Sequence, residues 1–71
     1  MITSVFEKGN RRLFIEVDAR SYLNMKGDVC EDVKITGTVE EDGSFVYEIN
    51  FVNEHLVEIF ARENGYIEIV L

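Results

Sequence analysis

An alternation of apolar and polar residues with a period of two, interrupted at glycine-containing turns, is the feature that most constrains this fold. Residues 2–8 alternate in this way, and a second alternating stretch, residues 11–18, follows Gly9 and Asn10. A two-residue loop with glycine in first position is typical of a type II′ β-hairpin. The predicted register pairs Lys8 with Arg11, Glu7 with Arg12, Phe6 with Leu13, Val5 with Phe14, Ser4 with Ile15 and Ile2 with Val17. This register matches apolar with apolar on one face and Glu7 with Arg12 on the other, so it predicts a first hairpin.

A second hairpin is predicted from residues 33–40 and 45–51, which also alternate. A two-residue turn at Asp42 and Gly43 would put the two apolar rows on opposite faces of the sheet. We therefore predict a three-residue loop, 41–43, with a type I turn, a bulge and glycine in the left-handed position. The predicted pairs are Val39 with Phe45, Gly37 with Tyr47, Ile35 with Ile49 and Val33 with Phe51.

The period then changes to that of a helix. Asn53 is a suitable N-cap, and Gly65 a suitable helix stop. Between them Leu56, Val57, Ile59, Phe60 and Ala61 form one predicted apolar face. Residues 66–71 alternate again, and we predict Ile67, Ile69 and Leu71 on one side, with Glu68 and Val70 on the open side of the sheet, away from the helix. The predicted class is α+β, a small five-stranded, mainly antiparallel sheet (β-β-β-β-α-β) with one helix packed on one face.

The length predicts a single domain over residues 1–71, with residues 19–32 as an irregular connection between the two hairpins. Within that connection a short helical turn ending at Gly27 and a bent strand leading into a turn at residues 26–28 are both compatible with the sequence. The one cysteine, Cys30, has no internal disulfide partner, which favours a reducing, cytoplasmic location. No apolar run is long enough to predict a membrane span.

The side chains that support catalysis are few. The chain has one cysteine and one histidine, Cys30 and His55, and no local motif connects them. A structural zinc site needs four such ligands, and the acidic stretches lack the spacing of a calcium loop. Neither of the glycine-rich phosphate-binding motifs is present. The sequence therefore predicts a protein that is not an enzyme and uses no metal or cofactor.

Charge is distributed unevenly along the chain, which has a formal net charge of −7. Residues 1–34 carry six bases and six acids, whereas residues 35–71 carry eight acids and one base, Arg62. Such a surface repels nucleic acid and anionic membranes and attracts basic protein surfaces. The expected partner is therefore a larger protein with a basic surface, with no direct contact to nucleic acid or membrane.

In size and charge the chain is similar to phage-encoded inhibitors and bacterial immunity proteins. We predict a non-enzymatic protein-binding module, an inhibitor or adaptor that could mimic nucleic acid. Its partner-binding residues are predicted to be the later acids and one aromatic anchor on the open face of the sheet: Glu40, Glu41, Asp42, Glu48, Glu54, Glu58, Glu68 and Phe14. The alternative is a self-assembling or complex-stabilising subunit, a homodimer for example, that buries Val5, Phe14 and Val46 between copies.

Overall fold

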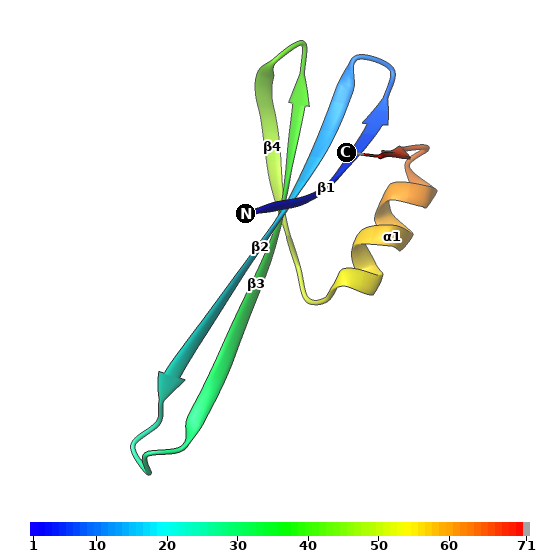
Figure 1. The fold of residues 1–71 in the computed structure, drawn as a ribbon. Helices are drawn as coiled ribbons and strands as arrows, with labels where there is room; N and C mark the ends of the chain where they lie inside the picture. The colour runs from blue at the N-terminus through cyan, green and yellow to red at the C-terminus, as the bar shows by residue number, and fades with distance from the viewer. Residues whose placement is uncertain (71) are drawn as a thin grey trace.

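The computed structural model describes residues 1–70 and contains one five-stranded sheet and one helix (Figure 1). The elements are β1 (Ile2–Lys8), β2 (Arg11–Leu23), β3 (Val29–Glu41), β4 (Ser44–Phe51), α1 (Glu54–Glu63) and β5 (Ile67–Ile69). The strand order is β4-β3-β2-β1-β5, and every neighbouring pair is antiparallel. The predicted α+β fold, with this element order and one helix beside the sheet, is confirmed.

The first hairpin has the predicted turn and, from Ser4 to Ile15, the predicted register. Gly9 has φ 60°, as the first position of a type II′ turn requires. The predicted pairing of Ile2 with Val17 is wrong, because Ile2 lies opposite Glu16. A β-bulge at Thr3 adds one residue to β1, so Ile2 moves to the opposite face of the sheet.

Residues 19–32 do not form the predicted irregular connection. β2 and β3 each continue for 13 residues and pair without interruption from Arg11 opposite Glu41 to Leu23 opposite Val29. A tight loop, residues 24–28, joins them, and the Asn24 side-chain oxygen accepts the backbone N–H groups of Lys26 and Asp28 at 2.9 and 3.0 Å. Of the two alternatives, the strand leading into a turn is therefore the one observed.

The second hairpin has the predicted strands but a different turn. Glu41 pairs with Ser44, so the loop is the two residues Asp42 and Gly43, both with positive φ (53° and 79°) as in a type I′ turn. A bulge in the ladder then sets Val39 opposite Tyr47 rather than Phe45. Because of the bulge, the apolar residues of β3 and β4 lie on the same face of the sheet, as they would with the predicted three-residue loop.

This register makes all four predicted pairs of the hairpin wrong. Ile35 lies opposite Phe51 rather than Ile49, and Val33 lies beyond the last pair of the β3–β4 ladder. Gly37 lies opposite Ile49, not Tyr47, and the ring that covers the glycine belongs to Phe51. Phe45 lies opposite Glu40, with its side chain on the sheet face away from the helix, and is 63% exposed, so its predicted pairing with Val39 is wrong.

The helix begins and ends where the sequence predicts. The Asn53 side chain accepts the Leu56 N–H at 3.1 Å, which caps the first turn. Gly65 (φ 77°) donates to the Arg62 carbonyl and Tyr66 to the Ala61 carbonyl, the hydrogen-bond pair of a Schellman motif.

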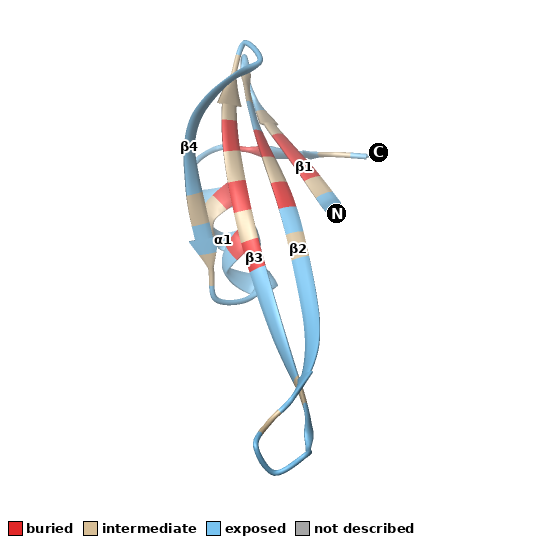
Figure 2. Ribbon diagram, turned by 90° about the vertical axis from the view of Figure 1, so that its left-hand side faces the viewer, coloured by how far each residue is buried: buried red, intermediate tan, exposed pale blue. Residues whose placement is uncertain are grey.

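The core lies between α1 and the sheet face that it covers (Figure 2). Leu13 and Val39 lie opposite each other with no exposed surface, and Gly37 lies opposite Ile15 on the same face, with the Phe51 ring above it. The core residues are Phe6, Leu13, Ile15, Ile35, Val39, Val57, Ala61 and Tyr66. Figure 2 shows that burial is confined to one half of β2 and β3, while their other half is exposed.

Candidate functional site

The predicted partner-binding residues fall into two groups on opposite faces of the sheet. We call the face covered by α1 the helix side and the other the open face. Glu54, Glu58 and Glu68 lie on the helix side. The remaining five lie on the open face or at the tip of the second hairpin: Phe14, Glu40, Glu41, Asp42 and Glu48. The acidic residues therefore do not form one continuous patch.

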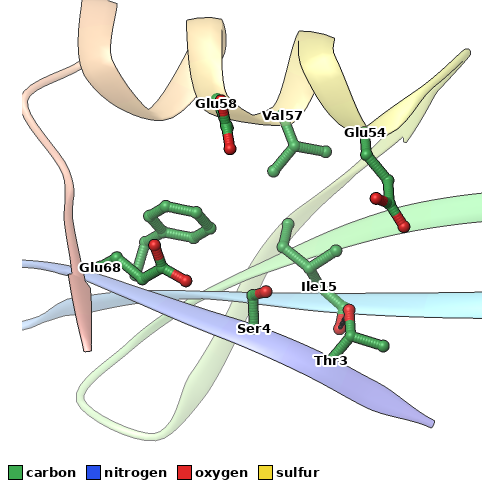
Figure 3. A pocket seen from close by; sticks show the side chains of 8 residues that line it. Thr3, Ser4, Ile15, Glu54, Val57, Glu58 and Glu68 are labelled. Atoms are coloured by element: carbon green, nitrogen blue, oxygen red, sulfur yellow. Dashed lines mark hydrogen bonds between the residues drawn. The ribbon is translucent and has the colours of Figure 1, made fainter. Parts of the chain in front are cut away.

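The helix-side group surrounds an open cavity of about 210 Å³ between α1, β1 and β5. Glu54 and Glu58 lie one turn apart on α1, on either side of the buried Val57, because residues i, i+3 and i+4 share one face of a helix. Figure 3 shows their carboxylates and that of Glu68 around the same space. We call these three residues, with this space, the acidic cavity.

The floor and wall of the acidic cavity differ chemically from its carboxylate rim. Phe6, Ile15 and Val57 supply apolar surface, and Thr3 and Ser4 supply hydroxyl groups. Thr3 reaches this side because of the β1 bulge, and its hydroxyl donates to the Ile15 carbonyl at 3.4 Å. The residues that line the cavity include no lysine or arginine.

Glu68 joins this group because β5 has the opposite facing from the one predicted. Glu68 pairs with Phe6 on the helix side, while Ile67 and Ile69 pair with Glu7 and Val5 on the open face. The physical reason is Tyr66, which is buried and stacks on Phe60 with ring centroids 6.3 Å apart. With Tyr66 directed into the core, the period of two directs Glu68 the same way. The prediction of Glu68 on the open face is therefore wrong.

At the hairpin tips, intramolecular contacts engage part of the negative charge. Arg11 forms an ion pair with Glu41 at 3.3 Å. The Asn10 amide donates to Glu41 at 3.2 Å and to Asp42 at 3.1 Å. Glu40 lies opposite Arg12, which itself pairs with Glu7 at 3.6 Å. Two of the three tip acids, Glu41 and Asp42, are therefore already engaged by side chains of the first hairpin.

The aromatic anchor Phe14 lies on the open face as predicted, beside Val5. Val5, however, is only 6% exposed, since Phe14 and Ile69 flank it on neighbouring strands. Val5 can therefore add little to an interface between copies through this face.

Cys30 and His55 lie in separate parts of the molecule. Cys30 pairs with Tyr22 near the far end of the long β2–β3 hairpin, and His55 lies in the first turn of α1. Within residues 1–70, no group of three or more histidine, cysteine or carboxylate side chains is arranged to hold a metal ion.

Sequence reasoning missed two features. The exposed half of the long hairpin was not predicted, nor was the gathering of Glu54, Glu58 and Glu68 around one space. The signal for the second was Tyr66, an aromatic residue directly after the helix stop, which sets the facing of β5.

No helix in the described part of the chain is long and apolar enough to cross a membrane. Comparison of the chain with protein-family models, with curated proteins and with solved structures returned no match.

Proposed function

We propose that this protein is a non-enzymatic protein-binding module, a small acidic inhibitor or adaptor that engages a basic surface of a larger protein. The observation that carries the proposal is the acidic cavity, where three carboxylates surround an apolar floor and no base lines the space. A lysine or arginine side chain has the matching form, an apolar stem with a charged end. The stem would lie on Phe6, Ile15 and Val57, and the charged end would meet the carboxylates.

The charge of the whole chain supports the same kind of partner. A net charge of −7 on 71 residues steers a basic protein toward the molecule and repels phosphate backbones. A basic surface that normally holds nucleic acid would suit this arrangement, with the carboxylates in the place of phosphates. The lone Cys30 agrees with a cytoplasmic location for the complex.

A small probe tests the cavity directly. Butylammonium carries the stem and charge of a lysine side chain, and butanol has the same stem without the charge. In an amide-resolved NMR titration we expect butylammonium to shift Ser4 and Val57 in a saturable way and butanol to shift them less. Equal shifts with both probes would contradict a role for the carboxylates.

Two matched triple variants then test partner binding. E54Q/E58Q/E68Q neutralises the acidic cavity, and E40Q/E41Q/D42N removes the same number of charges at the hairpin tip. A salt-sensitive partner captured from the native lysate should be lost with the first variant and retained with the second. The reverse result would move the site to the tip, and retention by both would overturn the proposal.

The second candidate function, a self-assembling subunit, is favoured by a different observation. The long hairpin exposes apolar side chains well away from the acidic cavity, at Leu23, Val29 and Val33.

A further inference from the structure

The far half of the β2–β3 hairpin, residues 18–34, projects from the sheet as a two-stranded arm (Figure 1). β1 stops pairing at Ile2, opposite Glu16, and β4 stops at Phe51, opposite Ile35. Beyond these points both edges of the arm are free, and the molecule extends 49 Å along its long axis against 23 and 21 Å across it. An isolated two-stranded ribbon is only marginally stable in water, so an arm of this length would gain stability from pairing with a further strand.

The arm carries an apolar row in line with the core. Ala19 lies opposite Val33, and Leu23 lies opposite Val29, on the same face as Leu13 and Ile15. No helix covers this stretch, and Leu23, Val29 and Val33 are 68%, 73% and 55% exposed. Exposed apolar side chains along a free strand edge are typical of a site for pairing with another chain.

The free edge of β2 presents the backbone groups of alternate residues. The Val17 N–H donates to the Met1 carbonyl at 3.2 Å, on the side where β1 ends. Since alternate residues of a strand direct their N–H and C=O to the same edge, Ala19, Ser21 and Leu23 direct theirs outward beyond β1. These groups are available to a further antiparallel strand.

We propose that two copies of this chain pair edge to edge through β2 of the arm, antiparallel and centred on Ser21. In this register Ala19 of each copy lies opposite Leu23 of the other, and Arg20 lies opposite Tyr22. Across four strands the row Val33, Ala19, Leu23, Val29 becomes continuously apolar, with the last two residues from the second copy. On the other face Arg20 lies beside the Tyr22 ring, a cation–π arrangement. The exposed apolar residues of the arm strands thus find apolar neighbours.

Charge favours a second copy on this edge and disfavours the edge of β3. Residues 18–34 carry three bases and four acids, whereas the rest of the chain carries four bases and ten acids, so the arm is where two copies repel least. The outward groups of β3 centre on Glu31, and a two-fold pairing there would set Glu31 against Glu31. Pairing through β2 sets Ser21 against Ser21 instead.

Two proline variants test the proposal. Ser21→Pro removes an outward N–H from β2 and leaves the β2–β3 ladder intact, because that N–H has no partner within the chain. Glu31→Pro makes the same change at the outward edge of β3. By analytical ultracentrifugation of the full chain over micromolar concentrations, we expect a dimer for the wild type and Glu31→Pro and a monomer for Ser21→Pro. A monomeric wild type, or a Ser21→Pro variant that stays dimeric, would overturn the proposal.

A cross-linking experiment avoids any dependence on the folding of a proline variant. Two residues that form a hydrogen-bonded antiparallel pair have Cα atoms about 5.5 Å apart, a distance that a disulfide spans. In a Cys30→Ala background, S21C should form a covalent dimer under mild oxidation, and E31C should remain monomeric. Cross-linking of E31C but not S21C would move the interface to β3, and cross-linking of neither would exclude both registers. A partner of another kind on the arm would give a monomeric chain in both experiments.

Discussion

The sheet body and the projecting arm are continuous along the same two strands, yet different contacts hold them together. In the body Leu13 and Val39 lie face to face under α1 with no exposed surface. In the arm the same two strands continue, but no other element covers either of their faces. Their cross-strand neighbours include oppositely charged pairs, Asp18 with Lys34 and Arg20 with Asp32. Burial therefore stabilises the body, whereas the arm depends on backbone pairing and weak surface interactions.

The largest expected difference is between two leucines of β2. Leu13→Ala removes a fully buried side chain and should lower the free energy of unfolding by ~2–5 kcal/mol, enough to unfold a domain of this size. Leu23→Ala removes an exposed one in the arm and should change it by less than about 0.5 kcal/mol. Chemical denaturation followed by circular dichroism, in a dilute monomeric sample, measures both. Equal losses would mean that the arm and body share one core.

The same difference explains what the sequence could predict. A strand with one covered face shows a period of two, so the first hairpin, the helix limits and the element order were all predicted. In residues 19–32 neither face of the strands is covered, and polar residues occur on both faces. Ser21 opposite Glu31, for example, lies on the same face as the core residues, so the sequence shows no alternation of apolar and polar residues there.

The turn of the second hairpin and the facing of β5 were not predicted, because each depends on a tertiary contact. A bulge corrects the alignment after Asp42 and Gly43, and the burial of Tyr66 fixes the facing of Glu68. The acidic cavity depends on that facing, and so only Glu54 and Glu58, one helical turn apart, could have been placed together from spacing alone.

A second prediction concerns the one glycine in the body that packing requires. A Cβ added at Gly37 would lie 2.7 Å from Phe51 Cε2 and 3.0 Å from Leu13 Cδ1. Because the Phe51 ring also packs against Phe60 at 5.7 Å, it has little freedom to move. We expect Gly37→Ala to cost ~1–3 kcal/mol, measured by denaturation. If the Phe51 ring is the obstacle, Phe51→Leu combined with Gly37→Ala should cost less than the sum of the two single changes.

A third prediction compares two asparagines that accept backbone N–H groups, one in each region. Asn53→Ala removes the cap of α1 and should destabilise the body by about 1 kcal/mol, seen as a lower Tm. Asn24→Ala frees the N–H groups of Lys26 and Asp28 in the arm loop and should leave the Tm nearly unchanged. Hydrogen exchange should instead become faster in the arm alone. A fall in Tm for Asn24→Ala would show that the arm unfolds together with the body.

The smallest expected effect is a pH dependence that belongs to the body. Burial raises the pKa of the Tyr66 hydroxyl above its ordinary value of 10.0, the nearby Tyr47 adds to the rise, and Arg11 opposes it. Because the folded protein holds this proton more tightly than the unfolded chain, Tyr66 contributes stability that is fully present below pH 10. That contribution is lost as the pH rises from the unfolded pKa through the folded one.

Tyr66→Phe should therefore reduce the alkaline loss of stability, and Tyr22→Phe, which changes an exposed tyrosine of the arm, should leave it as in the wild type. Melting curves from about pH 8 to pH 11.5, across the range in which tyrosine ionises, measure the slopes. Because lysine and tyrosine side chains in general ionise over this range, the difference between the two variants is the quantity that tests the prediction. If Tyr22→Phe flattened the profile as much as Tyr66→Phe does, a tyrosine in the arm would also have to become buried on folding or association. Repeating the measurement at low and high protein concentration separates an effect of the fold from one of association between copies.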